Sequence, residues 1–175
     1  MKDLWEIGKE LHLGFRKSVA GDEAIIDGLI HKRFGSRASY KPLDNIEGRY
    51  LMAINDAGEV VAITGLNYSN YYGGPEIDWT CVDSRYTGHR LASAMIAEVI
   101  KDCKEDIYCS CWRPNGKTVN LRSAMQDNGF VPVLIPRVSF SSDLFAICKR
   151  DCINYNPENG VCTCCEDLYV RRNKQ

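Results

Sequence analysis

The spacing of hydrophobic residues changes repeatedly along this chain, and the sequence therefore predicts short helices and strands in alternation. Apolar residues recur at helical spacing in four segments: residues 4–11, 22–34, 91–103 and 117–128. Gly129, directly after the fourth segment, is typical of a helix end. Runs typical of strands cover residues 13–19, 50–55, 60–68, 76–82, 107–112, 130–138 and 140–147.

A hairpin is predicted between the strands at 50–55 and 60–68, because Asp56-Ala57-Gly58-Glu59 joins them with turn-forming residues. The chain has 175 residues, which suffices for one domain with a small appendage. The sequence contains no internal repeat. We therefore expect a mixed α/β (α+β) fold with a central sheet and interleaved helices.

The charge and hydropathy of the chain limit the kinds of partner that the sequence supports. A formal net charge of −1 offers no general attraction to nucleic acid or to an anionic membrane surface. No apolar run approaches the roughly 18 residues of a membrane-spanning helix, and the N-terminus lacks the apolar centre of a signal peptide. These features predict a soluble cytoplasmic protein that binds neither membranes nor nucleic acid; the oligomeric state stays open.

The segment 87–92, which reads Thr-Gly-His-Arg-Leu-Ala, separates a predicted strand from a predicted helix. A helix start normally carries Asp or Glu, because its free N–H groups and its dipole favour negative charge. Here no acid occurs between Asp83 and Glu98, whereas His89 and Arg90 add hydrogen-bond donors. Such a start suits a bound phosphate group; the alternative is a plain exposed helix start.

Residues 76–92 resemble the acyl-CoA-binding motif of the GCN5-related N-acetyltransferase (GNAT) superfamily, typically Arg/Gln-x-x-Gly-x-Gly/Ala after a strand. Thr87 stands where Arg or Gln is usual, Arg90 stands where Gly is usual, and Ala92 fits. The order of elements over residues 13–147 also resembles the superfamily's plan, including a late helix that closes in Gly-Phe. Turn, helix and flanking strands in one order make a stronger signal than the turn alone.

The resemblance implies a mostly antiparallel central sheet flanked by helices, with two strands that splay apart at the cofactor site. It implies an N-acyltransferase that moves acetyl from acetyl-CoA to a primary amine by direct attack in a ternary complex. The chain would then consist of a helical extension at 1–12, a GNAT-like domain at 13–147 and a cysteine-rich tail at 148–175. The acceptor amine, on a small molecule or on a protein N-terminus or lysine, cannot be read from the sequence.

By the same resemblance, the backbone of the turn holds the pyrophosphate of coenzyme A, and the strand end before it meets the pantetheine arm through its main chain. Asn120 or Asn115 would bond the pantetheine amides. The implied cofactor-binding residues are Val82, Thr87, Gly88, His89, Arg90, Leu91, Ala92 and Asn120.

Glu76 occupies a position at which a number of family members carry a carboxylate that accepts the amine proton through water. Asp78 shares its strand face by the two-residue period, so the two catalytic candidates would raise each other's pKa or bind a cationic amine. The alternative for Glu76 is an ordinary surface residue. The family's usual proton donor, a Tyr of the late helix, is replaced by Met125. Substitutes that spacing does not rank are Tyr68, Tyr71, Tyr72, Tyr108, Cys109 and Ser123.

Five of the nine cysteines lie close together near the C-terminus: Cys148, Cys152, Cys162, Cys164 and Cys165. Thiolates on either side of a short loop suit a tetrahedral zinc ion, with an iron–sulfur cluster as a second option. The alternative is reduced thiols packed as small apolar residues. The basic end at 169–174 is expected to fray, and Cys109 and Cys111 are expected in the core.

Two other functional classes compete with the enzyme. The departures at Thr87, Arg90 and Met125 fit a non-catalytic GNAT-fold module whose metal-stabilised tail docks a partner. Redox sensing by the clustered thiols is the third class, but no cysteine occupies the helix start that lowers a thiol pKa.

Overall fold

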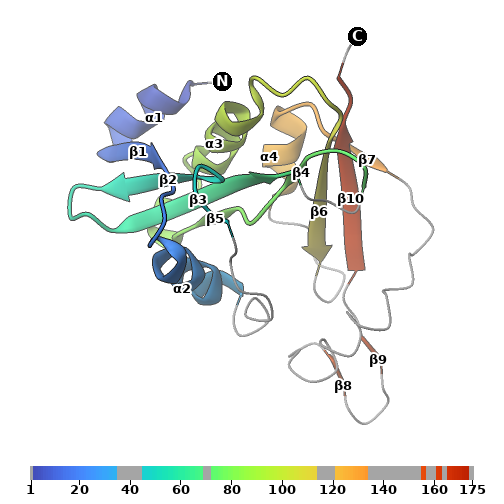
Figure 1. Cartoon of the computed structure of the whole chain (residues 1–175), viewed down its shortest axis with the longest axis horizontal. Coiled ribbons are helices and arrows are strands. Elements are labelled where there is room, and N and C mark those ends of the chain that lie inside the picture. The colour runs from blue at the N-terminus through green and yellow to red at the C-terminus, as the bar shows by residue number, and fades with distance from the viewer. Residues whose placement is uncertain are drawn as a thin grey trace.

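The computed structural model describes residues 2–34, 45–68, 72–113, 121–133, 155–156, 161–162 and 165–173 (Figure 1). Its helices are α1 (Leu4–Leu11), α2 (Glu23–Phe34), the 3₁₀ helix η2 (Ser84–Tyr86), α3 (Leu91–Ile100) and α4 (Arg122–Asp127). Its strands are β1 (Leu13–Lys17), β2 (Tyr50–Asn55), β3 (Val60–Asn67), β4 (Glu76–Ile77), β5 (Cys81–Val82), β6 (Ile107–Arg113), β7 (Val131–Val133), β8 (Tyr155–Asn156), β9 (Val161–Cys162) and β10 (Cys165–Arg171).

A mostly antiparallel sheet forms the centre of the molecule. Its strands lie in the order β1-β2-β3-β4-β6-β10-β7, and β5 joins it by pairing with β3. Among the described strands, only β4 and β6 pair in parallel. β8 and β9 form a small antiparallel sheet of their own. The fold class expected from the sequence is therefore confirmed.

The sheet separates two helical layers, with α2 on one face and α1, α3 and α4 on the other (Figure 1). Successive strand residues point to opposite faces. In β2, Tyr50 and Met52 accordingly pack with α2, whereas Leu51 and Ala53 pack with α1 and α3. Apolar residues at consecutive positions are what a strand covered on both faces requires. None of the described helices is long and apolar enough to cross a membrane.

The N-terminal helix α1 matches the helix predicted at 4–11, and it is held by a capping box at its start and by a close contact with β1. Asp3 and Glu6 form a capping box, in which each side chain accepts a hydrogen bond from the other residue's N–H. At Gly8 the helix lies close to β1. A Cβ added to this residue would lie only 2.6 Å from the ring of Phe15. Gly8, which weakens the helical pattern, therefore permits the contact between α1 and the sheet.

The predicted strand at 76–82 is interrupted in the structure. Glu76 and Ile77 form β4, Cys81 and Val82 form β5, and the three residues between them belong to neither strand. Asp78 donates its N–H to the carbonyl oxygen of Gly65 in β3, and its carboxylate accepts hydrogen bonds from the side chains of Arg49 and Tyr50. The prediction of one continuous strand is therefore wrong, because Asp78 at the interruption is bound by side chains of Arg49 and Tyr50, which lie far from it in the sequence.

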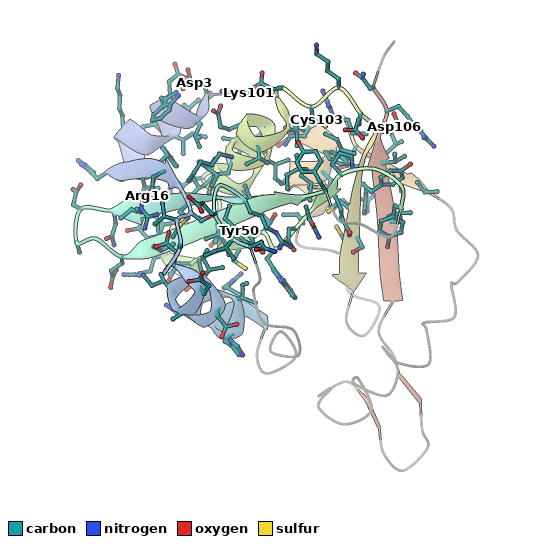
Figure 2. All side chains as sticks on the ribbon, viewed as in Figure 1. Asp3, Arg16, Tyr50, Lys101, Cys103 and Asp106 are labelled. Carbon is teal, nitrogen blue, oxygen red and sulfur yellow. The ribbon has the colours of Figure 1, made fainter. Side chains whose placement is uncertain are left out.

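The C-terminal end of the chain supplies a strand inside the sheet. β10 lies between β6 and β7, where Tyr169 and Val170 are 5% and 3% exposed. Two residues just past the strand bind Asp106, which is labelled in Figure 2. The side chain of Arg172 and the backbone N–H of Asn173 each donate a hydrogen bond to its carboxylate. The expected fraying of the basic end is therefore wrong for residues 169–173, because 169–171 pair with neighbouring strands and 172–173 bind Asp106.

Two predicted elements lie partly outside the described residues. α4 begins at Arg122, whereas the start predicted for this helix, Lys117, is not described. β7 covers residues 131–133 of the strand predicted at 130–138, and the strand predicted at 140–147 lies outside the described residues.

We predict that Val170→Ala lowers the free energy of unfolding by about 2 kcal/mol, because it removes buried methyl groups from a strand that is paired on both sides. Val131 is the matched control: it pairs with Val170 across the strands but is 55% exposed. Val131→Ala should cost less than about 0.7 kcal/mol. Urea denaturation measures both losses, and equal losses would contradict the placement of β10 inside the sheet.

Candidate functional site

Two parallel strands part at the centre of the sheet. β4 and β6 pair at Glu76 and Tyr108, and the N–H of Tyr108 donates to the carbonyl oxygen of Pro75 at 2.9 Å. The chain then follows β3, because β5 pairs with β3 through Val82 and Ala62. Within the described part of the chain, β5 has no second strand partner. The backbone edge of β5 away from β3 is therefore unpaired by any of these strands.

Asp83 fixes the chain where it leaves β5. Its N–H donates to the carbonyl oxygen of Val61 at 2.7 Å, and its buried carboxylate accepts bonds from Arg85 and from Lys32 of α2. The bonds from Arg85 and Lys32 hold the pKa of this carboxyl well below its usual range. One carboxylate thus ties β5, η2 and α2 together and sets the path of the turn that follows.

The turn at 87–90 is exposed and takes two left-handed backbone conformations. Gly88 has φ 88° and Arg90 has φ 59°. A Cβ on Gly88 would meet no heavy atom within 4 Å, so the turn faces open space at this residue. Arg90 adopts its φ at a cost of about 1–2 kcal/mol, which a glycine would avoid. The superfamily's usual Gly at the Arg90 position is therefore also the residue that this backbone favours.

The start of α3 carries neither a capping side chain nor an acid in its first turn. The first N–H groups of any helix have no carbonyl partner within it, and their partial positive charge attracts anions. Leu91 is 1% exposed and belongs to the core with α1 and β2, so only its backbone can serve a ligand. Ala92 is half-buried, whereas Thr87 and His89 are exposed.

Arg90 also contacts the end of α4. Its Nη1 lies 3.4 Å from Oδ2 of Asp127, and Ser93 donates to the same oxygen at 3.0 Å. The Arg90 side chain is 64% exposed, so this ion pair is screened by water. The contact links the first turn of α3 to the segment that ends in Gly129-Phe130.

The two catalytic candidates have different partners. Ser110 donates a hydrogen bond of 2.9 Å to Oε1 of Glu76. Asp78 instead accepts bonds from the guanidinium of Arg49 and the hydroxyl of Tyr50, whose pKa is raised by burial and by the Asp78 charge. The structure therefore gives each carboxylate a separate hydrogen-bonding group, and Asp78 is already paired with a cation.

The described candidates for a proton donor differ widely in their surroundings. Met125 is fully buried in the core beside α3 and β6. Tyr72 stacks on Tyr108 with ring centroids 5.5 Å apart, and Tyr68 is 66% exposed. Cys109 is buried with its Sγ 3.6 Å from that of Cys111, and this hydrogen bond and burial raise its pKa well above the ordinary thiol value. Cys109 therefore belongs to the core, as expected.

Ser123 is exposed on α4, and Tyr71 lies outside the described residues. The site residues predicted at Asn120, Cys148, Cys152 and Cys164 also lie outside them. Cys162 lies in β9 opposite Tyr155, and Cys165 begins β10 opposite Arg113. Among the described residues, no group of three or more His, Cys, Asp or Glu side chains is placed to hold a metal. The zinc site of the cysteine-rich segment stays a prediction.

A family model described as the acetyltransferase (GNAT) family matches residues 25–122, more than half of the chain. The chain belongs to this family. No curated protein sequence matches this GNAT protein significantly.

Solved structures share the fold at low sequence identity. A GNAT-family acetyltransferase from Bacillus cereus ATCC 10987 has a TM-score of 0.62 at 14% identity, covering 93% of this chain and 99% of its own. The diaminobutyrate acetyltransferase EctA from Paenibacillus lautus has a TM-score of 0.62 at 15% identity, covering 92% and 95%. The N-acetylglutamate synthase from Neisseria gonorrhoeae has a TM-score of 0.57 at 14% identity, covering 93% of this chain and 35% of its own.

Sequence reasoning missed several polar partners in this GNAT domain. Ser110, Lys32 and Asp127 contact Glu76, Asp83 and Arg90 respectively, from elements distant in the sequence. For Ser110 the sequence contained a signal: the alternation of β6 places this polar residue on the face of the sheet that the buried Cys109 and Cys111 do not occupy. Lys32 and Asp127 carried no such signal, since charged residues on helices usually face solvent.

We predict that Arg90→Gly is more stable than Arg90→Ala by about 1 kcal/mol, because only glycine relieves the left-handed backbone. Both substitutions remove the ion pair with Asp127, so that contribution cancels in the comparison. Chemical denaturation of the two variants measures the difference. An Ala variant as stable as the Gly variant would show that the turn is not left-handed at this residue.

The stability of the domain should depend on the ionisation of Asp83. Because its folded pKa lies below the unfolded value, its contribution is present above about pH 4 and is lost as the pH falls through the folded pKa. Asp83→Asn should therefore lower the free energy of unfolding by about 2 kcal/mol at pH 7 and by progressively less below pH 4. Exposed Asp102, changed to Asn, is the control. A difference that persists unchanged at pH 2.5 would argue against the ion pairs.

Proposed function

We propose that this GNAT protein transfers the acetyl group of acetyl-CoA to a primary amine by direct attack in a ternary complex. The observation that carries the proposal is the acid-free, uncapped start of α3, placed beside the turn at Gly88 that follows β5 and η2. A helix start of this kind is a ready anion site. In a GNAT domain the corresponding anion is the pyrophosphate of coenzyme A.

The residues of the turn fit a pyrophosphate. Open space beside Gly88 allows phosphate oxygens to approach the backbone, and the N–H groups of residues 88–92 would donate to them. Exposed His89 and Arg90 would add donors from their side chains. Arg90 can turn toward the phosphates at small cost, because its ion pair with Asp127 is exposed.

The pantetheine arm would lie along β5. This strand pairs with β3 through Val82, and its other edge has no partner among the described strands. Free backbone N–H and C=O groups at such an edge pair readily with amides of a ligand. Asn120 would be a further hydrogen-bonding partner of the pantetheine amides.

Acetyl-CoA would supply a thioester: the amine nitrogen bonds to the acetyl carbon, the carbon–sulfur bond breaks, and the thiolate takes up a proton to leave as the CoA thiol. An alkylammonium must first lose a proton, and we assign its acceptance to Glu76, directly or through water. One proton is released for each acetyl group transferred. Asp78, bound by Arg49 and Tyr50, would fix the neighbouring wall of the acceptor site.

The nature of the acceptor is supported by the structural relatives. The Paenibacillus lautus enzyme is solved with L-2,4-diaminobutyric acid and coenzyme A, and the Neisseria gonorrhoeae enzyme with coenzyme A and N-acetyl-glutamate. We therefore place amino acids and diamines first among the acceptors for this chain, before protein N-termini and lysines.

A second candidate is a GNAT-fold module that binds coenzyme A without turnover. Met125, which stands at the position of the family's usual tyrosine, is fully buried, so α4 offers no hydroxyl there. Thiol release in the presence of amines separates the two candidates, because a module of this kind binds the cofactor but releases no thiol.

Isothermal titration calorimetry with acetyl-CoA tests the proposal. Gly88→Trp should weaken binding by more than about tenfold, because the indole would occupy the space of the phosphates. Gly58→Trp is the matched control, since Gly58 also has a positive φ and open space around its Cβ but lies in the β2–β3 turn. Absence of saturable binding by the folded wild type would overturn the proposal, as would equal affinity of both variants.

A further inference from the structure

Ser110 contacts Glu76 from the neighbouring strand. The hydroxyl donates its 2.9 Å hydrogen bond to Glu76 from β6 to β4, and both residues are half-buried. On either side of Ser110, Cys109 and Cys111 lie in the core with residues of α3 and α4. The alternation of β6 therefore places Ser110 on the opposite face of the sheet, the face on which α2 packs against β2, β3 and β5.

The bond lies at the point where the sheet divides. On β6, Ser110 is two residues beyond Tyr108, which is the residue paired with Glu76. Within the described residues, the β4–β6 ladder contains this one pair, and the chain beyond β4 follows β3. The side-chain bond from Ser110 thus spans the two strands just past their last backbone pairing.

A hydrogen bond at this place restricts the carboxylate of Glu76. A glutamate side chain has three rotatable bonds, and a proton acceptor must be held within hydrogen-bond reach of the group that it deprotonates. A carboxylate offers about four acceptor positions, so the bond from Ser110 does not itself prevent Glu76 from accepting from a water or an ammonium group. The serine hydroxyl also stabilises the ionised form, which is the form that can accept a proton.

We propose that Ser110 is a positioning residue of the acetyl transfer, which holds the Glu76 carboxylate at the parting strands in the orientation that receives the ammonium proton. The inference rests on the proposed function, in which Glu76 is the proton acceptor. Ser110 acts through Glu76 and takes no part in the bond changes itself.

Steady-state kinetics with acetyl-CoA and an amine that supports thiol release test the role of Ser110. Ser110→Ala should lower kcat about tenfold and move the acid limb of kcat/KM to higher pH by about half a unit to one unit. The KM for acetyl-CoA should stay within about twofold, because the variant leaves the turn at Gly88 intact. Ser110→Thr keeps the hydroxyl and should restore the wild-type acid limb.

A double-mutant cycle with Glu76→Gln separates positioning from general damage. If Ser110 acts through Glu76, adding Ser110→Ala to Glu76→Gln should lower kcat by less than about twofold further. An equal tenfold loss in both backgrounds would overturn the inference, and so would a Ser110→Ala variant with the wild-type kcat and pH profile. Either result leaves the proposed function standing, provided that Glu76→Gln itself is impaired.

A titration of the Glu76 carboxylate by ¹³C NMR gives a readout that does not depend on turnover. Its midpoint should move to higher pH in Ser110→Ala and not in Ser110→Thr. An unchanged midpoint in Ser110→Ala would overturn the inference even if activity falls. A Glu76→Gln variant with full activity would instead reject Glu76 as the proton acceptor, and with it both the proposed mechanism and the role of Ser110.

Discussion

The separation of β5 from β6 is the constraint on which the candidate site depends. β6 pairs with β4 at Tyr108 and Glu76, whereas the chain after Ile77 pairs, among the described strands, with β3 alone, first through the bond of Asp78 to Gly65 and then through β5. An unpaired backbone edge is costly unless a ligand or water satisfies it. The same divergence brings Glu76 to the point of separation and carries the chain to an uncapped helix start. The cofactor, the proton acceptor and the acceptor amine would therefore meet at the place where β6 and the chain beyond β4 part.

Ion pairs and hydrogen bonds with α2 and α4 hold the turn after β5 and the start of α3 in place. Asp83 anchors the turn to α2 through Lys32, and Asp127 joins the start of α3 to the end of α4. In both contacts a carboxylate is paired with an exposed cationic side chain. The left-handed Arg90 shows that this turn retains its shape even without the glycine that such a backbone favours.

Features set by local chemistry were predictable from the sequence, and features set by distant contacts were not. The β2–β3 hairpin follows from its turn residues, and the phosphate-ready helix start follows from the missing acids. The interruption at Asp78 depends on Arg49 and Tyr50, nearly thirty residues away. The place of β10 was hidden because its apolar core, Leu168 to Val170, is short and follows a cysteine-rich segment. The bond between Ser110 and Glu76 required the strand register, which alternation alone does not supply.

The central claim is that the backbone of the α3 start receives the pyrophosphate of coenzyme A. A titration of ¹⁵N-labelled protein with coenzyme A, followed by the backbone amide shifts, tests it most directly. We expect the largest shifts at residues 88–92 and along β5, while the amides of the β2–β3 turn at 56–59 stay unchanged. Saturable shifts that leave residues 88–92 unaffected would contradict the account, because the cofactor would then bind elsewhere on the domain.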